Sequence, residues 1–252
     1  MKCVIADQYQ QYASFIRQIP ALFAQGEGEV VYAKRNEVRR MEHQGRVFIV
    51  KRYKKVNAIQ QLIYTFFRKT KAARAYLFAQ EFRRRGVPTP REIAYLETTP
   101  HGLFTIGYFV CEECLWREAA LDLREREDFD RELGRAVMQH TVEMHRKGVL
   151  HGDLNLTNYL YEKITEGRGQ KAEEGTYRFV MIDTNRSHFT KGMPSDAQCL
   201  KNLVRITHRR DLYEYLIRQY ADLRGWDAES TLRQALQMLD RFEHKGPLSW
   251  LK

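Results

Sequence analysis

The sequence predicts an α+β protein with a small antiparallel sheet in a first lobe and mostly helices in a second lobe. Two observations predict this class. Residues 29–51 contain three short runs of strand-forming residues separated by turns. From residue 126 onward, apolar residues recur at the three-to-four-residue spacing of amphipathic helices. At 252 residues the chain is long enough for one bilobal protein, and we expect lobes at residues 1–111 and 112–252.

The first lobe is expected to hold five strands and two helices. The strands are short apolar runs bounded by polar turns: 29–32, 37–41, 47–51, 92–96 and 103–110. The helices span residues 56–69 and 72–85, and the second ends at Gly86, before Pro88 and Pro90. The first helix is amphipathic. We expect its apolar face to pack on the core of the lobe, with insertion into a bilayer interface as the alternative.

The second lobe is expected to be helical around a short strand. Four helices are predicted by apolar periodicity: 126–146, 196–207, 211–223 and 228–243. A strand is predicted at residues 178–182. Residues 162–176 are charged and glycine-rich, which is typical of an exposed hairpin loop.

The stretch HGDLNLTN at residues 151–158 places an Asn five residues after an Asp, which is the spacing of a kinase catalytic loop. In phosphoryl transfer a carboxylate accepts the proton of the attacking hydroxyl, and a nearby amide oxygen binds Mg²⁺. Asp153 is therefore the candidate catalytic base and Asn158 a candidate metal ligand. Alone, either residue could simply cap a turn.

Two further residues stand where the same chemistry needs them. The strand at residues 178–182 ends in Asp183, a candidate second ligand of the Mg²⁺ that bridges the nucleotide phosphates. The strand at residues 47–51 ends in Lys51, which would bring an ammonium group to those phosphates. The order of these features along the chain favours a kinase over separate surface residues.

A turn between the first two strands is expected to cover the ATP phosphates. Gly26 and Gly28 precede the first strand, so they are not placed for this role. We expect Lys34, Arg35 and Asn36 to contact the phosphates through backbone N–H groups and a basic side chain.

A glutamate in the second helix usually pairs with the nucleotide lysine, and only Glu81 is available for that here. It lies late in the helix. Either Glu81 pairs with Lys51 in a shifted register, or Lys51 is positioned otherwise. The connector between the lobes contains Glu112 and Glu113, and its backbone N–H and C=O groups are expected to bind the adenine edge.

The positive charge of the chain is concentrated in one region. The net charge is +10, and residues 51–91 hold twelve Lys or Arg against a single acid. Such a stretch attracts polyanions such as nucleic acid, an acidic membrane surface or a phosphorylated or carboxylated glycan. The alternative is a solvated helix face with one active-site lysine.

Composition excludes several other classes of protein. The first residues lack the apolar core of a signal peptide, and no stretch approaches the roughly 20 apolar residues of a membrane span, so we expect a cytoplasmic protein. Four cysteines are too few for a disulfide scaffold, and Cys111 and Cys114 have no second pair at zinc-site spacing.

Two residues of the 151–158 loop concern the acceptor. Gly152 stands where protein kinases place an Arg that binds a phosphorylated activation segment, and Asn155 stands where they place a Lys. No Ala-Pro-Glu follows Asp183. These differences disfavour a protein substrate and favour a small molecule or a glycan.

The sequence resembles the bacterial lipopolysaccharide core kinases, which phosphorylate Kdo or heptose in the inner core. The resemblance covers residues 36–226 and is carried by five segments: 64–69, 85–90, 153–158, 182–186 and 199–203. It implies a protein-kinase-like fold, ATP and Mg²⁺ as cofactors, and a lipid-anchored anionic glycan as acceptor. It also implies peripheral attachment to an anionic membrane surface, at the inner face of the inner membrane.

Two other functions stay open from the residues alone. An aminoglycoside- or choline-type kinase shares the His-Gly-Asp and the later Asp but gives no reason for the basic stretch. A degenerate kinase fold could use that stretch to bind membranes or nucleic acid, although the presence of all four candidate residues argues against degeneration. Nucleic acid is disfavoured as a partner, and no obligate protein partner is expected.

Overall fold

The computed structural model describes residues 1–164 and 177–244, which form two compact units. The first comprises Met1–Arg84 and Thr89–Leu115, and the second comprises Arg85–Pro88 and the chain from Trp116 onward. The contacts thus divide the chain at residues 115 and 116. The functional boundary expected between residues 111 and 112 stays a prediction.

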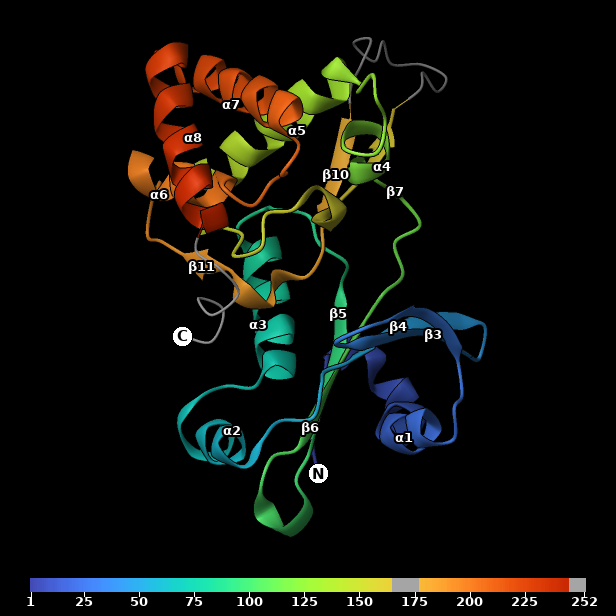
Figure 1. Cartoon of the computed structure of the whole chain (residues 1–252). Coiled ribbons are helices and arrows are strands. Elements are labelled where there is room, and N and C mark those ends of the chain that lie inside the picture. The colour runs from blue at the N-terminus through green and yellow to red at the C-terminus, as the bar shows by residue number, and fades with distance from the viewer. Residues whose placement is uncertain (165–176, 245–252) are drawn as a thin grey trace. The chain divides into compact units, whose positions relative to one another are not determined.

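The first unit is built on one antiparallel sheet of six strands in the order β1-β5-β6-β4-β3-β2 (Figure 1). The strands are β1 (Lys2–Ile5), β2 (Glu29–Ala33), β3 (Glu37–His43), β4 (Arg46–Arg52), β5 (Glu92–Thr98) and β6 (Ile106–Cys111). All five expected strands are present, and β1 is an addition that the sequence analysis missed.

Helices cover both faces of this sheet. Side chains alternate along β4, so Phe48 and Val50 lie in the core beneath α1 (Ala13–Ala24), while Lys51 points to the opposite face. That opposite face packs against α3 (Lys71–Arg84). Figure 1 shows α1 and α3 on the two sides of the sheet. Helix α1 was also missed, although four buried residues lie at helical spacing in it: Phe15, Ile16, Ile19 and Phe23.

The expected helix at residues 56–69 is present as α2 (Ala58–Leu62), which continues into the π-helical turn η2 (Ile63–Phe67). The expectation that its apolar face packs on the core is wrong, because none of its residues is buried. Instead, Tyr64 and Thr65 attach the helix to Phe104, in the loop before β6. The apolar side chains of the helix face solvent.

The second unit is mainly helical. Its helices are α4 (Ala119–Leu123), α5 (Arg131–Arg146), α6 (Asp196–Leu203), α7 (Arg210–Arg224) and α8 (Ala228–His244). Helix α5 packs on α7, and α7 packs on α8. Helix α5 begins five residues later than expected because the Asp130 side chain accepts a hydrogen bond from the Leu133 N–H and so caps its amino terminus.

Two small antiparallel sheets complete this unit. One has the order β10-β9-β7 and the other pairs β11 with β8. Their strands are β7 (Arg117–Glu118), β8 (Val149–Leu150), β9 (Tyr159–Lys163), β10 (Tyr177–Met181) and β11 (His188–Phe189). The expected hairpin loop at 162–176 lies mostly outside the described residues. Within the described ranges, no helix is long and apolar enough to span a membrane.

Candidate active site

The loop from β8 to β9 has a fixed shape because its own groups bond to one another. The backbone carbonyl of Asp153 accepts hydrogen bonds from the Asn155 N–H and from Nδ2 of Asn158, each at 2.8 Å. The Asn158 amide nitrogen is therefore used inside the loop, which leaves its Oδ1 as the group that can bind a ligand. The Asn158 carbonyl accepts from the Ile182 N–H at 3.0 Å and links this loop to Asp183.

His151 connects the same two segments. Its side chain is fully buried, with Nε2 2.9 Å from the Ile182 carbonyl and Nδ1 3.3 Å from the Asp153 N–H. Nε2 therefore donates and Nδ1 accepts, which is the pattern of a neutral imidazole. Burial lowers the pKa of His151 below its ordinary value, in agreement with that form. His151 positions the loop and is not placed as a base.

Two arginines flank the carboxylate of Asp153. Arg186 lies 3.6 Å from Oδ2 and Arg205 lies 3.6 Å from Oδ1. The Asp153 side chain is 31% exposed, so it is open to an incoming group. Neither arginine has a role that can be assigned from the sequence, because Asp153 lies far from both along the chain.

Close backbone packing explains the glycine in the loop. A Cβ on Gly152 would lie 2.0 Å from the Arg186 carbonyl oxygen, so no other residue fits without moving that segment. The neighbouring Asp183 has φ of +57°, a left-handed conformation that is uncommon for residues other than glycine. Asn185 donates a hydrogen bond to its Oδ1 at 2.5 Å. The turn holds Asp183 in one orientation.

A buried chain of hydrogen bonds fixes the catalytic loop to three helices. Asn202 of α6 donates to the His151 carbonyl at 2.7 Å and accepts from Nε2 of His145 at 3.0 Å. Nδ1 of His145, on α5, lies 2.7 Å from the hydroxyl of Tyr220 on α7. Burial lowers the pKa of His145 to about 4, so it is neutral near pH 7 and can accept from Tyr220.

The remaining candidate residues belong to the first unit. The Lys51 ammonium lies 5.5 Å from the centre of the Tyr53 ring, on the face of the sheet that α3 covers. In the exposed turn after β2, the Lys34 N–H donates to the Asn36 carbonyl at 3.1 Å. Oδ1 of Asn36 accepts from the Lys54 N–H at 3.2 Å, which ties the turn to the end of β4.

The three glutamates of the sequence analysis have partners in the same unit. Both oxygens of Glu81 accept hydrogen bonds from Arg84, at 2.6 Å. Its pairing with Lys51 stays a prediction. Glu113 accepts a hydrogen bond from Arg40 at 2.8 Å.

Both the side chain and the backbone N–H of Glu112 are hydrogen-bonded. Its carboxylate accepts hydrogen bonds from the Tyr9 hydroxyl, at 2.6 Å, and from Arg46. Its backbone N–H donates to the Arg91 carbonyl at 2.9 Å. That N–H is used in the pairing with residue 91, and the adenine contact expected of the connector stays a prediction.

The chain is similar to known proteins in sequence and in structure. Residues 24–225 match the model of the lipopolysaccharide kinase (Kdo/WaaP) family. The structure of WaaP in complex with acyl carrier protein is similar at 20% identity over 97% of this chain and 98% of that one, with a TM-score of 0.59. The Rio2 kinase complex with ADP/Mg²⁺ and phosphoaspartate from Chaetomium thermophilum gives 13% identity, 89% and 75% coverage and a TM-score of 0.45. No curated protein matches.

The sheet of the first unit, the helices of the second and the match to WaaP define a protein-kinase-like fold. The family model covers most of the chain. The chain belongs to the lipopolysaccharide kinase (Kdo/WaaP) family, and it is an ATP-dependent phosphotransferase that acts on sugar hydroxyls. The resemblance seen in the sequence is confirmed.

Proposed function

We propose that this kinase phosphorylates a hydroxyl of Kdo or heptose in the inner core of lipopolysaccharide. The acceptor is a lipid-anchored anionic glycan, and the reaction takes place at the cytoplasmic face of the inner membrane. The observation that supports this best is the Asp153 carboxylate, which is part-exposed, held between Arg186 and Arg205, and backed by an immobilised loop.

Asp153 acts as the catalytic base in this proposal. It accepts the proton of the sugar hydroxyl as that oxygen attacks the γ-phosphorus, and the bond from the γ-phosphorus to the β–γ bridging oxygen breaks to release ADP. Arg186 and Arg205 fix the orientation of the carboxylate, and their charges also stabilise the negative charge of the transferred phosphoryl group. Both are suited to an anionic acceptor as well, because guanidinium groups bind phosphate and carboxylate.

Asn158 and Asp183 fit a magnesium ion. Mg²⁺ prefers oxygen ligands. Asn158 offers its Oδ1, because its Nδ2 already donates to the Asp153 carbonyl, and Asp183 offers a carboxylate that its turn holds in place. A bound Mg²⁺ neutralises phosphate charge. Position 185 carries Asn, so it adds no second carboxylate to the site.

The ATP itself is assigned to residues of the first unit. Lys51 binds the α- and β-phosphates, and Lys34, Arg35 and Asn36 cover the phosphates from the turn that Asn36 fixes. Glu81 orients Lys51. Glu112, through its carbonyl, and Glu113 border the adenine.

The acceptor assignment is tested by measuring ATP turnover with and without purified lipid A precursors that carry Kdo, with phosphate transfer followed by mass spectrometry. We expect turnover that depends on the Kdo-bearing lipid. Transfer to an aminoglycoside or to choline instead would favour the small-molecule kinase. Nucleotide binding with no transfer to any acceptor would favour a degenerate kinase fold.

A further inference from the structure

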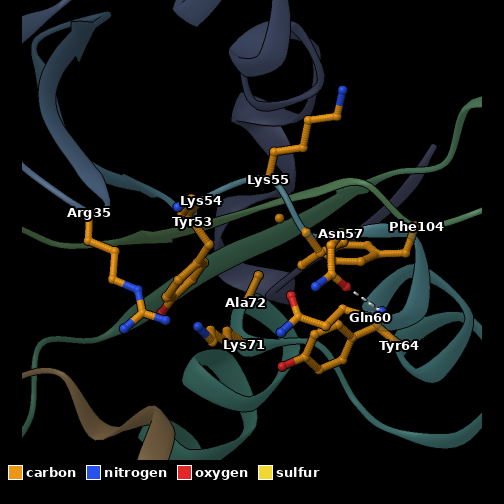
Figure 2. Close-up of a pocket in the computed structure, with 12 residues that line it drawn as sticks. Arg35, Tyr53, Lys54, Lys55, Asn57, Gln60, Tyr64, Lys71, Ala72 and Phe104 are labelled. Carbon is orange, nitrogen blue, oxygen red and sulfur yellow. Dashed lines mark hydrogen bonds between the residues drawn. The ribbon is translucent and has the colours of Figure 1, made fainter. Parts of the chain in front are cut away.

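The helix formed by α2 and η2 has its polar and apolar stripes reversed relative to a helix that packs on a core. Asn57, Gln60 and Tyr64 border a pocket of the first unit (Figure 2). The apolar stripe faces solvent, with exposed fractions as follows: Ile59 72%, Leu62 50%, Ile63 40%, Phe66 67% and Phe67 85%. A surface helix normally buries that stripe, so this one is built for an apolar environment outside the chain.

Specific bonds hold the helix in this orientation. The Thr65 hydroxyl accepts a hydrogen bond from the Phe104 N–H at 3.0 Å, and the Tyr64 ring lies edge-on to the Phe104 ring at 5.7 Å. Just before the helix, the Val56 N–H donates to the Thr105 carbonyl at 3.3 Å. The polar side is thus fastened to the loop before β6, and the apolar side is left outward.

The pocket beneath the helix has a volume of about 250 Å³ and is lined by cations and hydrogen-bonding groups. Four of the lining residues are basic: Arg35, Lys54, Lys55 and Lys71. Among the described residues, no acid lines the pocket. Figure 2 shows Arg35 and Tyr53 on one side and Asn57, Gln60 and Tyr64 on the other, with Lys71 between them. This chemistry suits a phosphate group.

The charges around the helix point to the same kind of partner. Residues 53–80 contain six Lys or Arg and no acid. Exposed pairs flank the helix at both ends: Lys54 and Lys55 before it, Arg68 and Lys69 after it. An exposed apolar stripe between basic residues is the pattern of a helix that lies in the interface of an anionic membrane.

Three further arginines of the basic stretch have partners within the protein. Arg83 pairs with the buried Glu92, and Arg84 pairs with Glu81. One guanidinium nitrogen of Arg85 donates to three backbone carbonyls: those of Lys147, Gly148 and Thr190. The attraction for an anionic surface therefore centres on the helix and its pocket, and not on the whole of residues 51–91.

We propose that α2, η2 and the pocket form a membrane seat, in which the apolar stripe enters the bilayer interface and Lys54, Lys55 and Lys71 of the pocket bind the phosphate group of an anionic lipid. The proposal rests on the proposed function, because it supplies the way in which a lipid-anchored acceptor reaches the enzyme. Tyr53 lines the pocket and also carries the Lys51 ammonium over its ring. The seat thus brings the lipid headgroup beside the lysine assigned to the nucleotide.

Vesicle flotation tests the apolar part of the seat. The parent protein should bind phosphatidylcholine vesicles that contain phosphatidic acid, and bind pure phosphatidylcholine vesicles weakly. Phe66→Gln together with Phe67→Gln should reduce binding to the acidic vesicles at least tenfold, because two aromatic rings no longer enter the interface. The matched control is Leu115→Gln, which changes a side chain that is 85% exposed elsewhere in the same unit, and it should bind like the parent.

Charge variants test the pocket. Lys54→Gln together with Lys55→Gln should weaken binding about thirtyfold, since each basic residue near an anionic surface contributes about fivefold. Lys71→Gln, at the centre of the pocket, should weaken it further. The control pair, Arg17→Gln with Arg91→Gln, removes the same charge from exposed positions of the same unit and should have a much smaller effect.

Three results would overturn the membrane seat. The first is a parent protein that does not bind acidic vesicles, and the second is a loss of binding in the control variants as strong as that in the seat variants. The third result is a loss of MgATP affinity in Lys54→Gln/Lys55→Gln that equals the loss of vesicle binding. The last result would assign the pocket to the nucleotide. Phosphate transfer to a short soluble Kdo acceptor is measured in parallel. Phosphate transfer without vesicle binding contradicts the membrane seat and supports the proposed function. Vesicle binding without phosphate transfer supports the membrane seat and contradicts the proposed function.

Discussion

At the scale of single residues, Asp153 carries the proposed chemistry. Asp153→Ala should lower kcat by about 10² to 10⁴, the usual contribution of a positioned general base, and leave MgATP affinity nearly unchanged. Single-turnover kinetics and equilibrium nucleotide binding measure the two quantities. Asp153→Asn keeps the size of the side chain but removes the carboxylate that accepts the proton, so it should lower kcat to a similar extent. An equal fall in nucleotide affinity would contradict the assignment.

Asp183 can be tested without disturbing its unusual backbone. Asn tolerates the left-handed conformation that Asp183 adopts, so Asp183→Asn should keep the turn and remove only the charge. Affinity for the Mg²⁺–nucleotide complex should fall, and more Mg²⁺ should be needed for half-maximal activity. Asp222→Asn, at an exposed position, is the control. A Mg²⁺ dependence identical to that of the parent would exclude Asp183 from the metal site.

Gly152 offers a steric prediction. A methyl group there meets the Arg186 carbonyl oxygen at 2.0 Å, so Gly152→Ala should displace Arg186 from Asp153 and lower kcat. Overpacking of this kind also costs about 1 to 3 kcal/mol in the free energy of unfolding. Urea unfolding and steady-state kinetics measure both effects. Gly192→Ala is matched to it, because a Cβ at Gly192 meets no atom within 4 Å, and should change neither quantity.

At the scale of secondary-structure elements, α5, α6 and α7 are joined through His145, whose pKa burial lowers to about 4. An unfolded histidine has a pKa near 6.5, so between about pH 6.5 and 4 the unfolded state binds more protons. The free energy of unfolding should therefore fall as pH is lowered through this range, by about 3 kcal/mol for this group. The neutral form of His145 is what stabilises the fold.

Unfolding measured across that pH range tests the role of His145. His145→Gln should reduce the slope of unfolding free energy against pH, whatever its effect on stability at pH 7. Part of the slope should persist in this variant, because burial also lowers the pKa of His140 to about 4. A slope unchanged by His145→Gln would contradict the assignment.

At the scale of the whole molecule, nucleotide binding should stabilise the folded state. At a MgATP concentration of about 100 times its Kd, the gain is about 2.7 kcal/mol, which for a chain of this size raises Tm by several degrees. Thermal unfolding with and without MgATP measures the shift. Lys51→Gln should show a smaller shift at the same concentration. An equal shift would mean that Lys51 does not contact the nucleotide.

The sequence by itself determined most of the elements and their order. The five expected strands of the first unit are present. The structure also has the expected order along the chain: the strand with Lys51, a helix, the loop with Asp153 and Asn158, and the strand before Asp183. Strands and helices of this kind follow from local periodicity and from turn residues, which act over a few positions of the chain. The family resemblance was carried by the same local motifs.

Only the tertiary structure decided what depends on residues far apart in the chain. The arginines beside Asp153 come from positions 186 and 205, and the glycine before it is required by a carbonyl at residue 186. Periodicity marked residues 56–69 as amphipathic but could not say which side faces the protein. The hydrogen bond from the Phe104 N–H to the Thr65 hydroxyl, between segments 39 residues apart, settled that the apolar stripe faces out. A local pattern indicates the secondary structure of a segment, whereas the residues that the segment contacts are fixed only when the chain folds.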